Sequence, residues 1–271
     1  MFTIHIIESG YIMADGGAMF GAVPKRAWMR KYKSDENNLC SLSMRCVLAI
    51  SEDRKILIDT GMGTKHLKEV SYYQPDQLLD LNTALNNYDC TADEITDVIL
   101  THLHFDHCGG ATYKNSKGKT VPTFPNARYW LSRKQWNSFK NPNKLEEDSF
   151  FADNIVPVYE TGLLHFVDED MELIDGFNLQ LYEGHTTGQL VTFIETLDGT
   201  SVFPGDVIPT SAHVSLEWIS AYDICALTSL SEKERLLGKA VDNNYTLIYC
   251  HDSQVASSKV KQLNDNYKAD I

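Results

Sequence analysis

Residues 101–110, THLHFDHCGG, hold three of the nine histidines of this chain and an aspartate. It follows the apolar run 98–100, which indicates a buried strand. His102 and His104 can converge on one ion, because alternate residues of an extended chain point to the same side. Asp106 and His107 come shortly after His104 in the sequence and can turn toward a second ion. The stretch therefore predicts a metal site whose other ligands must come from elsewhere in the chain.

The composition is that of an ordinary globular protein with a substantial core. The 271 residues are 43% hydrophobic and 23% charged, without a linker or low-complexity tract. We predict a single domain over residues 1–271. The formal net charge of −13 argues against a nucleic-acid partner and against docking on an anionic membrane.

Three features of the sequence indicate a cytoplasmic protein. No apolar run approaches the ~18 residues that a membrane span needs. The first residues, MFTIHIIE, favour a strand and lack the basic-then-apolar order of a secretion signal. The six cysteines form no Cys-x-x-Cys pair, a pattern typical of reduced thiols.

Two β-rich halves with helices between strands predict a layered α/β architecture. Strands are expected at 2–7, 43–50, 55–58, 97–100, 177–182, 190–195, 201–203 and 246–250. Helices are expected at 77–85, after a capping box at 91–94, and at 231–241 with a cap at Ser231. The irregular segment 14–40 is interpreted as a loop near the active site, with an oligomer contact or a self-packed surface loop as alternatives.

Three further ligand-type side chains stand directly after predicted strands. His185 lies in YEGHTTGQ, Asp206 in FPGDV and His251 in IYCHDS. Strand ends are where α/β folds gather their sites, so these residues are the candidates that complete the metal site. His5, His66 and His165 match no motif and are interpreted as structural or surface residues. Cys108 is expected to pack under the loop rather than act as a nucleophile.

The order His-x-His-x-Asp-His, Gly-His-Thr-x-Gly-Gln, Pro-Gly-Asp and a late His-Asp resembles the metallo-β-lactamase fold superfamily, over about residues 43–252. Asp59 in Asp-Thr-Gly matches its early Asp-x-Gly element. The resemblance implies a four-layer αβ/βα sandwich with metals at one edge between the sheets. It assigns His102, His104 and His185 to the first metal. It assigns Asp106, His107 and His251 to the second, with Asp206 bridging both and Asp59 orienting a ligand imidazole.

Such a centre implies hydrolysis by a hydroxide that bridges two divalent metal ions, with Asp106 and Asp206 as catalytic residues. Imidazole and carboxylate ligands suit Zn²⁺, and Fe or Mn remain open. A diiron oxidoreductase is disfavoured because its branch typically carries Glu where this chain has His104. A non-catalytic metal-binding protein is disfavoured because the ligand set is complete.

Within the superfamily, the chain resembles the branch of quorum-quenching lactonases and methyl-parathion-type hydrolases. The lead substrate is an N-acyl homoserine lactone or a similar lactone, and the alternatives are a phosphotriester, an aryl ester or a thioester of the glyoxalase-II type. Candidate pocket residues are Met19, Phe20, Trp28, His213 and Tyr222. Lactonases carry a tyrosine shortly after the bridging aspartate, where this chain has VIPT at 207–210, so Tyr222 is the candidate substitute. The expected partner is a small molecule, and a homodimer is an open alternative.

Overall fold

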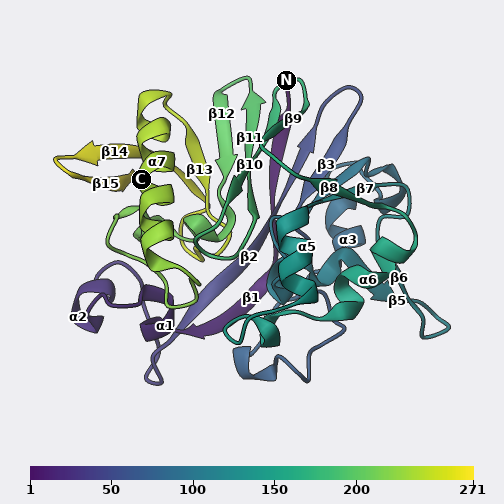
Figure 1. The fold of residues 1–271 in the computed structure, drawn as a ribbon, viewed down its shortest axis with the longest axis horizontal. Helices are drawn as coiled ribbons and strands as arrows, with labels where there is room; N and C mark the ends of the chain where they lie inside the picture. The colour runs from purple at the N-terminus through teal and green to yellow at the C-terminus, as the bar shows by residue number, and fades with distance from the viewer.

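Two β-sheets face each other and helices cover both outer faces, as Figure 1 shows. The computed structural model describes residues 1–271. The layers run helix, sheet, sheet, helix, so the predicted αβ/βα sandwich is confirmed. None of its helices combines the length and apolar character that crossing a bilayer requires.

The first sheet has six strands, all from residues 3–167. Its first three strands are antiparallel neighbours, and the next three are joined in parallel. In spatial order the strands are β1 (Thr3–Asp15), β2 (Leu39–Ile50), β3 (Lys55–Ile58), β4 (Asp97–Ile99), β7 (Arg128–Ser132) and β8 (Leu164–Val167).

The second sheet has seven strands from the C-terminal half and is antiparallel except for the β12–β13 pair. In spatial order they are β15 (Asn266–Asp270), β14 (Ser257–Leu263), β13 (Thr246–Ile248), β12 (Gly199–Phe203), β11 (Gln189–Thr196), β10 (Phe177–Tyr182) and β9 (Met171–Ile174). A separate hairpin joins β5 (Thr112–Lys114) to β6 (Thr120–Pro122).

Strand β2 shows why the layers form. Successive side chains of a strand point to opposite faces, and both faces of β2 are apolar. Val47 and Ala49 pack between the sheets, whereas Cys46 and Leu48 pack against the helices outside. A strand that is apolar on both faces must be covered on both, which places the sheet in the middle of the molecule.

The helices form two groups on opposite sides of the molecule. On the outer face of the first sheet lie α3 (Leu81–Asn86), α5 (Arg133–Lys140) and α6 (Ala152–Glu160). On the outer face of the second lies α7 (Ala226–Asp242). The connecting segments contain short helical elements. The α-helices among them are α1 (Gly16–Phe20), α2 (Lys25–Trp28) and α4 (Phe105–Cys108). The 3₁₀ turns are η1 (Ser71–Tyr73), η2 (Ala92–Glu94), η3 (Gly109–Ala111), η4 (Glu147–Ser149), η5 (Gly205–Val207) and η6 (Ser211–Val214).

Two predicted helix starts are wrong. The helix expected at 77–85 begins at Leu81 behind the N-cap Asp80, because Gln77 has a φ of +49° that no helix permits. The helix expected from Ser231 begins five residues earlier, at Ala226. Ser231 lies inside α7 and donates to the Thr228 carbonyl. The capping box that opens η2 is confirmed.

The segment 14–40 is more regular than predicted. It contains the end of β1, both α1 and α2, and the start of β2. Phe20 and Trp28 are 0% and 1% exposed and stack with ring centroids 5.1 Å apart. The segment therefore closes one end of the molecule with its own aromatic core.

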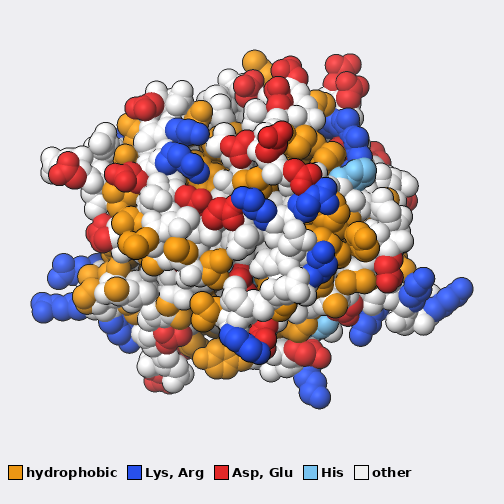
Figure 2. All heavy atoms as spheres, in the orientation of Figure 1, with side chains coloured by type: hydrophobic (Ala, Val, Ile, Leu, Met, Phe, Trp, Pro, Cys, Tyr) orange, Lys and Arg blue, Asp and Glu red, His pale blue; other side chains and the backbone are white.

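Charged side chains of both signs are scattered over the face in Figure 2. Lysine and arginine side chains lie interspersed with acidic ones over most of this face, and a few gather at its lower left edge. This distribution agrees with the strong excess of acidic residues in the sequence.

Candidate metal centre

The candidate ligands come from four loops, each of which leaves the carboxyl end of a strand. His102 and His104 follow β4, and Asp106 and His107 occupy the first turn of α4. The other three follow strands of the second sheet: His185 comes after β10, Asp206 lies in η5 after β12, and His251 comes after β13. The site therefore lies between the two sheets and takes side chains from both.

Two glycines let the turn at 101–110 lie against the segment after β3. A Cβ on Gly109 would lie 2.0 Å from the Met62 carbonyl oxygen, and one on Gly110 would lie 2.2 Å from that of Thr60. The close approach is fixed by backbone hydrogen bonds from Thr60 N to His107 O (2.7 Å) and from Gly110 N to Gly61 O (2.9 Å). The Cys108 thiol is buried beneath the turn and donates to the Leu103 carbonyl, as packing of this residue predicts.

Three imidazoles converge to form the first ligand set. His104 Nδ1 lies 3.0 Å from His102 Nε2 and 3.2 Å from His185 Nε2. All three side chains are buried. A tetrahedral ion with bonds of about 2.0–2.1 Å holds its ligand atoms roughly 3.3 Å apart, so these nitrogens fit one ion.

The second set combines two imidazoles and a carboxylate. His107 Nε2 and His251 Nε2 lie 3.1 Å apart. Asp106 Oδ2 lies 3.7 Å from the first nitrogen and 3.5 Å from the second. These separations again fit the edges of a coordination polyhedron around one ion.

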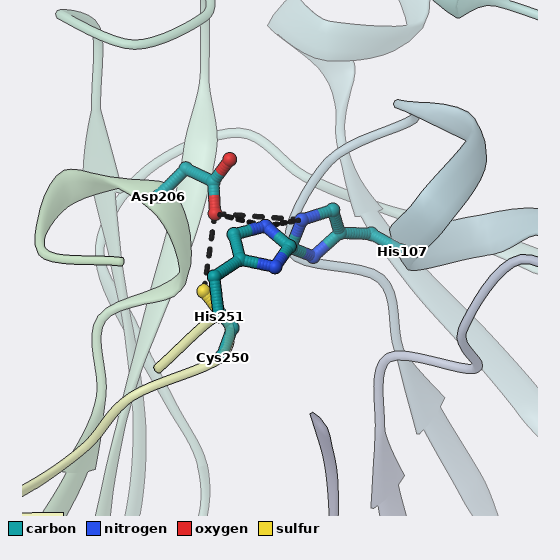
Figure 3. Close-up of side chains that lie close together, drawn as sticks. All are labelled: His107, Asp206, Cys250 and His251. Atoms are coloured by element: carbon teal, nitrogen blue, oxygen red, sulfur yellow. Dashed lines mark hydrogen bonds and ion pairs between the residues drawn. The ribbon is translucent and has the colours of Figure 1, made fainter. Parts of the chain in front are cut away.

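Asp206 joins the two sets. Its Oδ2 lies 3.2 Å from His185 Nε2, and its Oδ1 lies 3.1 Å from His251 Nε2 and 3.4 Å from His107 Nε2. Figure 3 shows the Asp206 carboxylate facing the imidazoles of His107 and His251, with the Cys250 sulfur below it. The Cys250 thiol donates to Asp206 Oδ1 at 3.1 Å, a contact that the sequence patterns did not indicate. One carboxylate with an oxygen toward each set is the geometry of a bridging ligand.

Each imidazole has an acceptor near its other ring nitrogen, which is how proteins orient metal-binding histidines. The acceptors are as follows: Thr101 Oγ1 at 3.0 Å for His102, Glu146 Oε1 at 3.4 Å for His104, Asp59 Oδ2 at 2.8 Å for His107, Asp223 Oδ1 at 2.9 Å for His185, and the Ser43 carbonyl at 2.7 Å for His251. Asp59 also accepts from the Thr101 amide and hydroxyl. Glu146, Asp223 and Ser43 escaped the sequence interpretation because isolated carboxylates and backbone carbonyls carry no motif.

Electrostatics in the cluster favour a protonated imidazole beside a charged carboxylate. Burial opposes the charge of Asp206, but the surrounding imidazoles, led by His251, outweigh it and hold the pKa of that carboxyl well below its usual value. Burial likewise opposes protonation of His107, but the carboxylates around it, led by Asp206, raise its pKa well above the usual value. This mutual support without a metal shows how strongly the cluster attracts positive charge.

A cavity of about 80 Å³ opens directly beside the cluster. It is floored by ligand side chains and Glu146, and apolar residues form much of the wall. No lysine or arginine lines it. The wall residues are Ile12, Ala14, Met19, Leu42, Tyr73, Phe105, Leu145, Ser149 and Tyr222.

The predicted pocket residues are thus divided. Met19 and Tyr222 line the cavity, whereas Phe20, Trp28 and His213 do not, and for these three the prediction is wrong. His213 is 1% exposed, stacks on Phe20 and pairs with the Met19 carbonyl through Nε2 at 2.9 Å. Aromatic packing draws these side chains into the layer behind Met19.

The remaining histidines lie away from the cluster. His66 pairs with Asp153 at 2.7 Å and stacks on Phe151. His5 packs on Tyr88, and His165 packs on Trp130. Each has a local packing partner, in agreement with the structural interpretation of these residues.

Fold and site together define a class of protein: metal-dependent hydrolases with a His- and Asp-rich centre between two sheets. The family model of the metallo-β-lactamase superfamily matches residues 45–251, and the chain belongs to this superfamily. The prediction of the superfamily and of a metal-dependent hydrolase is confirmed.

Two solved structures and one curated relative are similar to this chain. A probable metal-dependent hydrolase from Staphylococcus aureus is 30% identical with a TM-score of 0.89, covering 95% of this chain and 92% of that one. AidC, a dizinc quorum-quenching lactonase in complex with a product, is 21% identical with a TM-score of 0.79 over 99% and 93% of the two chains, and shows the fold alone. The N-acyl homoserine lactonase AiiA of Bacillus thuringiensis subsp. kurstaki is 24% identical over 213 residues, 73% of this chain and 72% of the relative.

Proposed function

We propose that the chain is a dinuclear metal-dependent hydrolase whose substrate is a neutral ester, with an N-acyl homoserine lactone as the lead compound. The observation that carries this proposal is the paired ligand sets joined by Asp206, next to a cavity with an apolar wall. The similarity to an N-acyl homoserine lactonase supports the substrate class.

The residues have distinct roles in this proposal. His102, His104 and His185 would hold one ion, and Asp106, His107 and His251 would hold the other, with Asp206 shared and Zn²⁺ the expected metal. When bound, two such ions would supply a nucleophile from water at neutral pH and polarise the substrate oxygen. Asp106 lines the cavity and is placed to pass a proton toward the leaving oxygen. Asp59, Asp223 and Glu146 orient the imidazoles.

The cavity wall favours a neutral substrate over an anionic one. A glutathione thioester brings carboxylates that need basic partners, and no lysine or arginine lines the cavity. Apolar groups such as Met19, Leu42 and Phe105 suit an acyl chain or an aromatic ring.

An aryl ester or a phosphotriester is the second candidate substrate, because of where the tyrosine side chains lie around the site. Val207 and Ile208 follow Asp206 and are buried, so no phenol reaches the site from there. Tyr73 and Tyr222 line the cavity instead, from two separate loops. Either phenol can donate a hydrogen bond to a substrate oxygen. This arrangement does not favour a lactone over an aryl ester or a phosphotriester.

The test is a substrate screen on purified protein with metal analysis beside it. We expect two equivalents of zinc and turnover of a lactone or aryl ester. His102→Ala and Asp206→Ala should lower turnover at least a thousandfold and reduce metal content, because each removes a ligand. His165→Ala is the control and should leave both unchanged. Two bound metals without turnover of lactones, aryl esters, phosphotriesters or thioesters would contradict the proposed activity.

A further inference from the structure

The connector between α5 and α6, residues 141–151, forms one wall of the cavity. Leu145, Glu146 and Ser149 line the cavity, and Leu145 is 77% exposed at its rim. Phe150 approaches the His104 ring with a centroid distance of 5.5 Å. The connector therefore meets both the substrate space and one ligand of the first metal.

Glu146 is the most deeply buried acidic side chain of the connector. It is 2% exposed and has no lysine or arginine partner. Its carboxylate accepts hydrogen bonds from the Asn143 amide and the Thr186 hydroxyl. Each oxygen thus accepts one hydrogen bond and can accept another, and a further partner that donates offsets more of the cost of burying this charge.

That partner is the outer nitrogen of His104. His104 alone among the five imidazoles turns Nδ1 toward the other ligands, which leaves Nε2 on the side of Glu146. Nε2 is buried, lies 3.4 Å from Glu146 Oε1 and has no closer partner. An imidazole that binds a metal through Nδ1 carries its proton on Nε2, and a carboxylate is the acceptor that fixes this tautomer.

We propose that Glu146 is a positioning residue that couples the first metal site to the pocket wall. It fixes the ring of His104, and through the same contact the metal-loaded site holds the connector against the cavity. The inference rests on the proposed metal centre. It adds that loading of the first site orders residues 141–151 and thereby shapes the place where substrate binds.

The test compares Glu146→Gln with the matched control Glu147→Gln. Glu147 is the next residue, pairs with Lys144 at 2.9 Å and does not line the cavity. Zinc affinity is measured by chelator competition, and hydrogen exchange of residues 141–151 is measured with and without zinc. In the wild type, zinc should slow exchange of the connector. Glu146→Gln should weaken one of the two zinc sites about tenfold and remove this slowing, whereas Glu147→Gln should do neither.

A second variant keeps the test sound if Glu146→Gln does not fold. Asn143→Ala removes one donor to the carboxylate and should cause the same changes at smaller size. Unchanged zinc affinity in both variants, or connector exchange in the wild type that ignores zinc, would overturn the inference and leave the proposed function intact. A wild type that binds no zinc would overturn both.

Discussion

The ring nitrogens show how single residues define this site. Four histidines turn Nε2 inward and His104 turns Nδ1, and every outward nitrogen faces an acceptor. An imidazole fixed on both sides has one orientation and one tautomer when the metal is bound. Ligand geometry is thus set by residues that never touch the ion.

The raised pKa of His107 gives a prediction at this scale. The carboxylates around His107 raise its pKa well above the usual value, which favours the protonated ring in the metal-free protein. A metal ion requires the neutral ring, so binding must release that proton. The pKa of His251 in the same set is raised as well, so zinc affinity should fall by at least about tenfold for each unit of pH lowered below these pKa values.

Calorimetry checks this expectation. The apparent enthalpy of zinc binding at pH 7 should change with the ionisation enthalpy of the buffer. Asp59→Asn removes a charge that raises the pKa of His107 without removing a proposed ligand, and should reduce the number of protons released. Binding without proton release would show that His107 is already neutral or is not a ligand.

At the scale of single residues, the side chains that sequence reasoning proposed as ligands lie together in the structure, whereas the residues that support them were missed. His102 to His107 lie within one short motif, and strand ends marked His185, Asp206 and His251. Glu146 and Asp223 are distant in sequence from the histidines that they contact, and nothing local distinguishes them from surface carboxylates. Which side of segment 14–40 meets the cavity likewise depends on packing, so Phe20 and Trp28 were misplaced.

The turn at residues 101–110 is the element on which the candidate site depends. Gly109 and Gly110 press it against residues 60–62, where any side chain would meet backbone. The elements themselves were predicted best where their signals were local, as in the capping box that opens η2. The start of α7 was missed because its N-cap, Cys225, makes no capping hydrogen bond through its side chain. Ser231 has the sequence pattern of an N-cap residue but lies inside the helix.

Gly109→Ala should destabilise the fold and the site together. Its Cβ would lie 2.0 Å from the Met62 carbonyl oxygen, and backbone on both sides must shift. We expect a loss of about 3 kcal/mol in the free energy of unfolding and weaker zinc binding. Gly238→Ala in α7 is the control, since its Cβ would meet only the Tyr267 hydroxyl at 3.5 Å. It should stabilise the chain by about 0.5–1 kcal/mol, and urea denaturation measures both.

At the scale of the whole molecule, the proposed ions connect the two sheets. His102, His104, Asp106 and His107 belong to the first sheet's loops, and His185, Asp206 and His251 belong to the second's. An ion that binds only when both sets are in place stabilises the folded state as a whole.

Removal of metal should therefore lower the thermal midpoint in one cooperative step. With free zinc at about a thousand times its Kd, binding adds about 4 kcal/mol for each site. Differential scanning calorimetry with and without a chelator measures the difference. His251→Ala should abolish much of the zinc-dependent gain, while His165→Ala should keep it. A midpoint that ignores the chelator would contradict this coupling.

The order of the ligands along the chain has a consequence for biosynthesis. The proposed set opens at His102 and closes only at His251. A growing polypeptide that has just exposed the first histidines on the ribosome holds only part of each coordination sphere. If the proposed pair of ions is bound, it can be complete only after the strand before His251 has left the exit tunnel and docked. A partly synthesised chain therefore cannot complete the proposed metal centre.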